Sequence, residues 1–457
     1  MVRRILMKSI IKGGLVLLPH ADDFVKLDIV VDDSGNISEL GDDIAITGNE
    51  MTHVIDVTDK YIIPGLINAH AHLFASGNLS DKKPTAVVVK TIAALLQTKV
   101  GKKILTDRMK HNALTELRTG VTTIRSVGEF HYLDVKLRDD AEKEVGIYPN
   151  LLVSGFLLSI TGGHGAPYLA LESDSPWDGR KNVRKNVKAG VDWIKICATG
   201  GVTDARRVGE AGALQFTEEE MTAICQEAHK VNLMVAAHAQ STEGVRLALR
   251  AGVDTIEHGA AMDEEIIQLF KNNPKSYRGY SALIPTFAPA APFTLLDPND
   301  LKLDPITVKN AEIVYHNMIT GYKQALENDI KIGVGNDASM TFVTHYDFWR
   351  ELDYASQIAN LKPIDVITRA TAGNAEIIGL KDKIGTIEPS KMADLLILST
   401  NPLNNLKHLT DIYCVVKSGT VVPDKNADFF EPLNALLDDI ADNKLPESLN
   451  KISLEEE

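Results

Sequence analysis

Short apolar runs alternate with amphipathic segments through the middle of the chain. Eight runs have the length and composition of buried strands, and they cover residues 61–70, 121–128, 151–159, 191–200, 233–239, 253–259, 281–287 and 330–337. Helical patterns separate most of them, most clearly at 217–231, 241–252 and 308–329, and the first opens with the capping-box pair Thr217 and Glu220. Eight strand–helix units predict an α/β fold, a (β/α)8 TIM barrel over residues 61–383.

An open, doubly wound parallel sheet is the alternative for alternating strands and helices. That fold places a G-x-G-x-x-G turn after its first strand when it binds a dinucleotide. No such glycine pattern follows the first predicted strand. The pattern therefore favours the barrel.

The two ends of the chain have a different hydrophobic pattern from the middle. Residues 7–60 and 384–422 consist of short alternating segments separated by turns. The economical prediction is one small composite β-sandwich domain, built from residues 1–60 and 384–422. Residues 423–457 are acidic and partly helix-like, and we expect them to form a surface or subunit-contact appendage without chemistry of its own.

Composition narrows the classes of partner. The 457 residues carry a formal net charge of −14, whereas nucleic acid or an anionic membrane favours a basic surface. No stretch approaches the ~20 apolar residues needed to span a bilayer. The three cysteines, Cys197, Cys225 and Cys414, are far apart and lack CxxC spacing, which disfavours a disulfide framework or a cysteine zinc site. We therefore expect a cytoplasmic protein with a small-molecule partner.

Polar side chains stand where the predicted strands end. In a (β/α)8 barrel these ends converge on the active site, and the residues found there are His70, His72, Lys195, His238, His258 and Asp337. Residues two apart on a strand face the same way, so the first two imidazoles point together. An isolated pair of this kind also fits two hydrogen-bonded histidines, but four imidazoles and a carboxylate are suitable ligands for zinc or another divalent ion.

Lys195 is the unusual member of this group. It stands between Ile194 and Ile196 in a strand that should be buried. Burial of an ammonium group is unfavourable, so such a lysine tends to lose its proton and become a nucleophile. With carbon dioxide it can form a carbamate, an anionic ligand able to bridge two cations. The alternative is a lysine that reaches solvent or pairs with a carboxylate such as Asp192.

Five segments together carry a family resemblance: PGLINAHAHL, IKICATGGV, AAHAQS, TIEHG and GVGNDAS. In this combination the chain resembles the amidohydrolase superfamily of metal-dependent hydrolases over roughly residues 7–422. The segments ATGGV, TIEHG and TGGHG are most similar to the imidazolonepropionase-like and prolidase-like branch, which includes Xaa-Pro dipeptidase relatives. The resemblance implies a barrel that commonly associates, so a homo-oligomer is expected.

The resemblance also implies a role for each candidate ligand. His70 and His72 would bind one metal ion with Asp337, and His238 and His258 would bind a second. Carboxylated Lys195, formed with carbon dioxide, would bridge the two ions. Zinc is the expected metal, although manganese, iron and cobalt suit the same ligands. Asp337 would also take a proton from the metal-activated hydroxide and pass it to the leaving nitrogen.

The substrate contacts are predicted from the loops. His164, in TGGHG, resembles a position that contacts the carbonyl or carboxylate of the substrate, the alternative being a surface histidine. Arg206 and Arg207 could hold a carboxylate, or both could be solvated. Gln240 stands where related peptidases that cleave basic C-terminal residues have a tyrosine, which puts that preference in doubt. His345, after the eighth strand, is a further candidate substrate contact.

These features predict a binuclear amidohydrolase that cleaves an amide-type C–N bond. The expected substrate is small and carries a carboxylate, as a dipeptide or an N-acyl amino acid does. A cyclic amidohydrolase of the imidazolonepropionase type, a lactonase and a deaminase are alternatives, and Lys195 counts against the deaminase. A metal-free scaffold protein is a more distant alternative, because every expected ligand is present.

Overall fold

The computed structural model describes residues 9–45, 53–78, 91–92, 94–298, 303–423 and 427–456. The first eight residues of the predicted β domain lie outside this part of the chain. Within the described residues, no helix combines the length and the apolar character required to cross a bilayer.

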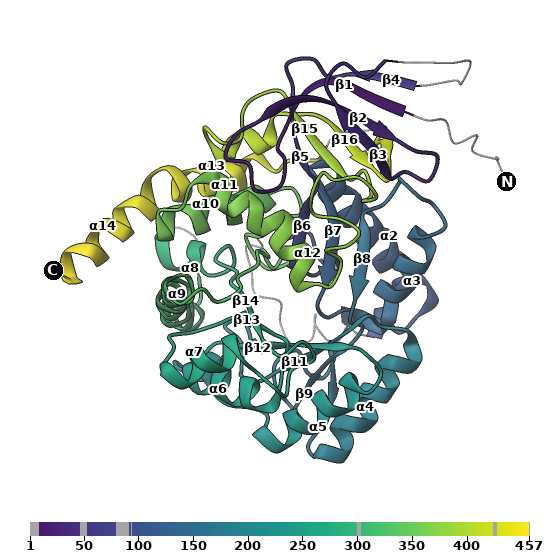
Figure 1. Cartoon of the computed structure of the whole chain (residues 1–457). Coiled ribbons are helices and arrows are strands. Elements are labelled where there is room, and N and C mark those ends of the chain that lie inside the picture. The colour runs from purple at the N-terminus through teal and green to yellow at the C-terminus, as the bar shows by residue number, and fades with distance from the viewer. Residues whose placement is uncertain are drawn as a thin grey trace.

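Parallel strands form the centre of the molecule, in two sheets (Figure 1). The smaller sheet contains β6 (Leu66–Ala71), β7 (Val121–Ser126) and β8 (Asn150–Val153). The larger sheet has the order β10 (Ala170–Glu172), β9 (Leu157–Ser159), β11 (Trp193–Cys197), β12 (Met234–Ala239), β13 (Thr255–His258) and β14 (Ala282–Ile284). Because every pair is parallel, the carboxyl ends of these strands point the same way.

Backbone contacts join the edges of the two sheets. At one junction the Asp192 amide donates to the Val153 carbonyl at 2.8 Å. At the other, residues 330–338 lie between β14 and β6, with isolated bridges from Leu283 to Ile332 and from Ala71 to Ala338. The parallel strands and these junctions are those expected of a TIM-barrel-type α/β arrangement.

Three predicted strands differ from the observed ones. The predicted strand 61–70 is two strands, β5 (Tyr61–Pro64) and β6, because the chain leaves one sheet for another at Gly65, whose missing Cβ would lie 2.3 Å from the Thr122 hydroxyl. The predicted strand 151–159 is broken into β8 and β9, where the Gly155 amide donates to Asp134 at 2.7 Å. Residues 330–337 form only bridges, because the side chain of Asn374 bonds the backbone of Val334.

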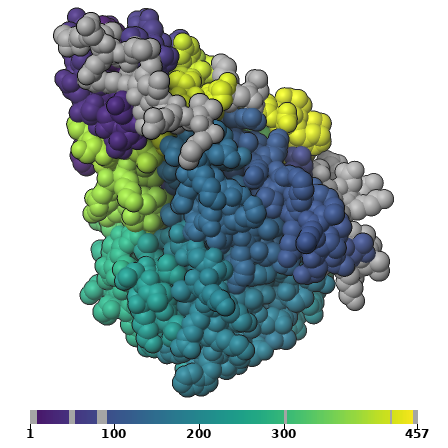
Figure 2. Space-filling view, turned by 90° about the vertical axis from the view of Figure 1, so that its right-hand side faces the viewer, coloured from purple at the N-terminus to yellow at the C-terminus, as the bar shows by residue number. Residues whose placement is uncertain are grey.

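Strands from both ends of the chain share one mixed sheet. Its order is β17 (Thr420–Val421), β16 (Ile412–Lys417), β15 (Leu395–Leu398), β5, β1 (Ser9–Val16), β2 (Val25–Val31) and β3 (Ile37–Gly41), with β4 (His53–Asp56) also beside β1. Antiparallel pairing of β15 with β5 joins the two ends. Figures 1 and 2 show these purple and yellow-green segments together at one end of the molecule. Its buried side chains include Ile11, Ile29, Ile62 and Leu395.

Helices cover the outer side of the parallel strands (Figure 1). They are α2 (Lys99–Arg118), α3 (Leu133–Ala141), α4 (Pro176–Ala189), α5 (Glu218–His229), α6 (Thr242–Ala251), α7 (Glu264–Lys271), α8 (Ala291–Leu295), α9 (Pro305–Glu327), α10 (Phe348–Ala359), α11 (Pro363–Thr368) and α12 (Asn374–Ile377). Short helical turns stand at η1 (Phe130–Tyr132), η2 (Glu210–Gly212), η3 (Arg369–Gly373), η4 (Leu406–Thr410) and η5 (Ile440–Lys444). The predicted capping box of α5 is confirmed, because Thr217 and Glu220 bond each other's backbone amides.

The C-terminal segment forms α13 (Glu431–Asp439) and α14 (Leu445–Glu456). Leu433, Leu437 and Leu445 are buried against the body of the molecule. An ion pair of 2.7 Å between Arg350 of α10 and Asp438 also holds α13 in place. Figure 1 shows α14 projecting beyond the other helices. Its role as a subunit contact stays a prediction.

Candidate active site

The six predicted metal ligands line one cavity of about 320 Å³. They come from β6 and the residue after it, β11, β12, β13 and the segment that bridges β14 to β6, and none is more than 7% exposed. They are His70, His72, Lys195, His238, His258 and Asp337. The structure therefore brings together side chains that are up to 267 positions apart in the sequence.

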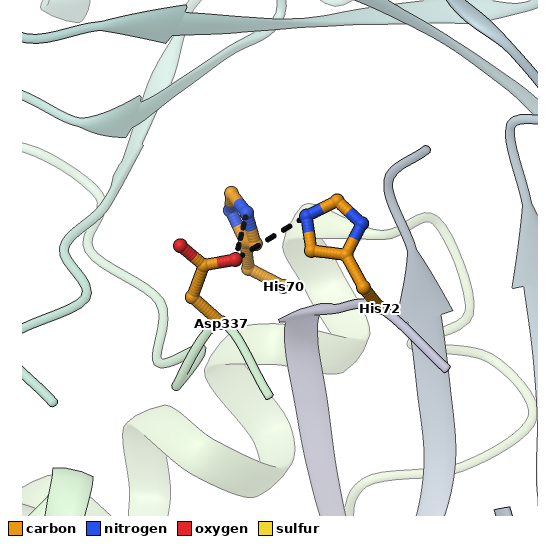
Figure 3. A group of neighbouring side chains, drawn as sticks. All are labelled: His70, His72 and Asp337. Atoms are coloured by element: carbon orange, nitrogen blue, oxygen red, sulfur yellow. Dashed lines mark ion pairs between the residues drawn. The ribbon is translucent and has the colours of Figure 1, made fainter. Parts of the chain in front are cut away.

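His70, His72 and Asp337 form the tightest group. The Nε2 atoms of both imidazoles lie 3.3 Å from Asp337 Oδ1, and Figure 3 shows both rings directed at this carboxylate. The other ring nitrogen of each histidine donates elsewhere, from His70 Nδ1 to Glu257 at 2.6 Å and from His72 Nδ1 to the Gly128 carbonyl at 2.7 Å. Both Nε2 atoms therefore direct a lone pair toward Asp337.

This arrangement fits a bound cation. Burial lowers the pKa of His72, which disfavours a second proton on that ring. Asp337 Oδ1 is buried and has no hydrogen-bond partner among the described residues. Three acceptors that converge on one point repel each other, and a divalent ion among them removes that repulsion.

His238 and His258 form the neighbouring pair, with ring centroids 4.5 Å apart. His238 donates from Nε2 to the Gly200 carbonyl at 2.7 Å, which leaves Nδ1 as its free acceptor. His258 uses Nδ1 with the Thr286 hydroxyl at 2.7 Å, which leaves Nε2. Burial lowers the pKa of both imidazoles well below the usual histidine range. Each ring is thus held neutral with one nitrogen able to bind a metal ion.

Lys195 lines the same cavity as the two groups of candidate ligands and is 3% exposed. Its Nζ has no hydrogen-bond partner among the described residues, and burial lowers the pKa of the amine. Asp192, the alternative partner considered from the sequence, is instead bonded to Arg138 at 2.7 Å. A buried, unpartnered amine is suited to reaction with carbon dioxide, because it is nucleophilic when neutral.

Two of the ligands lie at strained backbone positions. His258 has φ of 70° and Asp337 has φ of 60°, in the left-handed region that residues other than glycine seldom adopt. Such conformations raise the free energy of the folded state by roughly 1–3 kcal/mol each and gather at functional sites. At the end of β13 the turn lets the consecutive residues Glu257 and His258 both reach the His70 ring.

The predicted substrate contacts divide into two sets. His164 and Gln240 line the cavity; His164 stacks on His238 with ring centroids 4.4 Å apart, and the buried Gln240 Oε1 has no described hydrogen-bond partner. Arg206, Arg207 and His345 are not among the described residues that line it.

The structure shows the surroundings of Arg207 and His345. The side chain of Arg207 is 84% exposed. His345 is buried and occupied elsewhere, because Nδ1 contacts Glu116 at 2.9 Å and Nε2 contacts the Ala75 carbonyl at 2.8 Å. The roles of Arg206, Arg207 and His345 as substrate contacts stay predictions.

Sequence reasoning missed several residues around the ligands. Glu257 and Arg125 form a fully buried ion pair of 2.8 Å beside His70. Burial alone would raise the pKa of Glu257, but the Arg125 guanidinium lowers that pKa below its usual range. Asp204 contacts His164 Nδ1 at 2.6 Å. The one available signal was a charged residue inside an apolar strand, as in VTTIRS, which is the signal that identified Lys195.

Much of the remaining cavity wall is apolar. Its side chains come from β9, α8, α9 and several loops, and they include Phe74, Leu157, Leu169, Val202, Phe293 and Met318. Among the described lining residues, Lys195 is the only lysine or arginine. The cavity thus combines a polar, metal-suited floor with apolar walls, which is the usual composition of a small-molecule site.

Glu351 of α10 holds one wall of this cavity. Its carboxylate oxygens accept from the amides of Phe287 and Ala288, both at 2.8 Å, just before the lining residues Pro289 and Ala290. Glu351 is 1% exposed, and burial raises the pKa of its carboxyl from 4.5 to about 8. The native protein therefore binds this proton more tightly than the unfolded chain.

The free energy of unfolding should therefore fall as the pH rises from about 4.5, the usual pKa of this carboxyl, to about 8, its pKa in the folded protein. A carboxyl whose folded pKa is raised stabilises the native state at low pH, and that contribution is lost by about pH 8, at up to ~1.4 kcal/mol per pH unit. Glu351→Gln removes this dependence but sets an amide NH2 against one backbone N–H, a loss of ~1–3 kcal/mol. Urea unfolding measures the free energy of unfolding of both proteins. The amount by which the variant is less stable than wild type should shrink between about pH 6 and 8. A difference that stays constant over this pH range would contradict the prediction.

A model of the Amidohydrolase family matches residues 61–422, most of the chain. The chain belongs to the amidohydrolase family. Ochratoxinase from Aspergillus niger is 23% identical to it over 429 residues, covering 87% of this chain and 82% of that protein. Imidazolonepropionase from Shouchella clausii is 22% identical over 430 residues, covering 86% of this chain and 87% of that protein.

Solved structures are similar to this amidohydrolase over nearly its whole length. A candidate prolidase from Bifidobacterium longum shares 40% identity with a TM-score of 0.83, covering 95% of this chain and 99% of that one. A Xaa-Pro dipeptidase with bound methionine in its active site shares 27% identity with a TM-score of 0.76, covering 91% and 99%. These likenesses confirm the predicted superfamily and its imidazolonepropionase-like and prolidase-like branch.

Family membership decides the class of reaction. This amidohydrolase is an enzyme, a hydrolase that acts on carbon–nitrogen bonds. The metal-free scaffold is thereby set aside. The family is generally metal-dependent, and the group of His70, His72 and Asp337 agrees with that dependence.

Proposed function

We propose that this protein is a binuclear metal-dependent amidohydrolase that cleaves dipeptides or N-acyl amino acids, with its site at the mouth of a (β/α)8 barrel. One observation carries the proposal. The Nε2 atoms of His70 and His72 meet the Asp337 carboxylate at 3.3 Å, while their Nδ1 atoms contact Glu257 and the Gly128 carbonyl. The unpartnered Lys195 amine, His238 and His258 line the same cavity. This is a ligand set for two divalent ions, with zinc the expected metal.

Two bound divalent ions would polarise the scissile carbonyl and lower the pKa of a shared water. His70, His72 and Asp337 would hold one ion, and His238 and His258 the other, with the carbamate of Lys195 between them. The protein supplies the proton transfer. Asp337, which lines the cavity, would accept a proton from the attacking water and deliver it to the leaving nitrogen.

The cavity supports a substrate with polar and apolar parts. His164, held at Nδ1 by Asp204, would contact the carbonyl or carboxylate of the substrate. Gln240 Oε1, which has no hydrogen-bond partner among the described residues, would accept from an N–H of the substrate. The apolar wall would receive the side chain of the substrate. The Xaa-Pro dipeptidase that this chain resembles has methionine in its active site, which supports an amino acid as one half of the substrate. We therefore favour apolar over charged side chains on the cleaved amino acid.

A hydrolysis screen tests this function. Metal-loaded protein is offered dipeptides and N-acyl amino acids with apolar, basic or acidic side chains, together with cyclic amides and lactones, and Asp337→Asn serves as the blank. Turnover of the apolar dipeptides or N-acyl amino acids, absent from the blank, is the expected result. Turnover of ring substrates alone would contradict the proposal and would indicate a cyclic amidohydrolase or a lactonase instead.

Metal removal should abolish activity reversibly. The expected stoichiometry is close to two ions per chain, because two ligand groups line the cavity. A chelator should remove both ions and the activity, and zinc or manganese should restore them. Since ions that bind only the native state stabilise it, the melting temperature should also rise on reconstitution. Full activity in chelated, metal-free protein would contradict the proposal.

A further inference from the structure

Arg125 of β7 is fully buried and bonded on three sides. Its Nε donates to the Ala69 carbonyl at 2.5 Å, and Nη1 donates to the Thr255 hydroxyl at 3.0 Å. Nη2 donates to both carboxylate oxygens of Glu257, at 2.8 and 2.9 Å. The guanidinium also lies 4.5 Å from the centre of the Trp193 ring. Because a buried cation is unfavourable without a counter-ion, this position requires Glu257.

Glu257 of β13 connects that cation to the metal site. Its Oε2 accepts from His70 Nδ1 at 2.6 Å, and Oε1 accepts from the Thr255 hydroxyl at 2.5 Å. The carboxylate thereby keeps the His70 proton on Nδ1 and the Nε2 lone pair toward Asp337. In the opposite tautomer, His70 would present an N–H to Asp337 and could not bind a cation there.

We propose that Arg125 and Glu257 form a positioning pair for the metal site, in which Glu257 sets the tautomer and ring angle of His70 and Arg125 holds Glu257 in place. This inference rests on the metal site of the proposed function. Neither residue is among the described residues that line the cavity, so both act through His70. Loss of the carboxylate partner of a metal-binding histidine weakens metal affinity or activity by ~10–100-fold.

Two double variants separate the hydrogen-bond acceptor from the buried charges. Arg125→Met with Glu257→Gln removes both charges but keeps an oxygen that can accept from His70. Arg125→Met with Glu257→Leu removes the acceptor as well. Neither leaves a lone buried charge, which would itself destabilise the fold. Zinc affinity, measured by competition with a chelating dye, should fall ~10–100-fold in the leucine variant and by less in the glutamine variant.

Glu116→Gln is the matched control. Glu116 is also buried and contacts a histidine Nδ1, that of His345 at 2.9 Å, but this histidine does not line the cavity among the described residues. Its zinc affinity should stay at the wild-type value. Wild-type zinc affinity in the leucine variant would overturn the positioning role.

A second measurement does not depend on the double variants. Nitrogen NMR of metal-free, histidine-labelled wild-type protein reports which ring nitrogen of His70 carries the proton, and the signal is assigned by its loss in His70→Gln. A proton on Nδ1 is expected, and a proton on Nε2 would overturn the proposal even if the double variants did not fold. Wild-type protein that bound no zinc and hydrolysed nothing would instead contradict the proposed function, while the tautomer would still test the pair.

Discussion

Asp337→Asn should reduce kcat by about 10³-fold or more, because a ligand and the general base are lost together while the shape of the side chain is kept. The asparagine amide cannot accept the proton of the attacking water. It also places a neutral group where His70 and His72 direct their lone pairs. The backbone bond from the residue 337 amide to the His70 carbonyl does not depend on the side chain, so the fold should persist.

Metal content and kcat are measured together in this variant. Asp134→Asn is the control, since Asp134 is a buried carboxyl bonded to the Gly155 amide and is not among the described residues that line the cavity. That control should keep kcat within a few-fold of wild type. Retention of a tenth or more of kcat by Asp337→Asn with full metal content would contradict both roles of Asp337.

Lys195→Ala should lower metal content from two ions per chain to one or none, with a loss of activity of about 10³-fold. The reason is the position of the amine, which is buried, unpartnered and lines the cavity beside both groups of imidazoles. Without a carbamate, His238 and His258 are the remaining ligands of the second ion, too few for tight binding. Metal analysis and kinetics check this outcome.

A carboxylate supplied in solution should partly restore the Lys195→Ala variant. Propionate can place its carboxylate in the space left by the lysine and bridge the ions as the carbamate would. Lys331→Ala serves as control, because Lys331 is 43% exposed and paired with Glu376 at 2.8 Å. Normal metal content and activity in Lys195→Ala would rule out the carbamate bridge, whereas rescue by propionate in that variant alone would support it.

The ligand set was predictable because it depends on local rules. His70 and His72 stand two residues apart at a strand end, so one strand orients both. Lys195 was conspicuous because a charge inside an apolar strand conflicts with the pattern around it. The parallel alignment of strand ends then predicts that such residues meet, and all six candidate ligands line one cavity in the structure.

The surroundings of the loop residues could not be predicted in this way, because loop conformation depends on contacts that are distant in the sequence. Arg207 follows a strand end, as the ligands do, yet its side chain is exposed. His345 contacts Glu116, which lies 229 positions earlier, and is not among the described residues that line the cavity. The predicted eighth strand is interrupted by bonds from Asn374 to Val334, which the local pattern of residues 330–337 does not reveal.

Strand period, residue chemistry and motif resemblance predicted the class of fold, the hydrolase family and the candidate ligands, since these are local properties of the chain. How those candidate ligands are held depends on contacts between distant parts of the chain. The tautomers of His70 and His72 depend on Glu257 and on the Gly128 carbonyl, and the charge of Glu257 depends on Arg125, 132 positions away. Proton positions in a buried site follow from which groups meet in space, and that is decided by the packing of the strands.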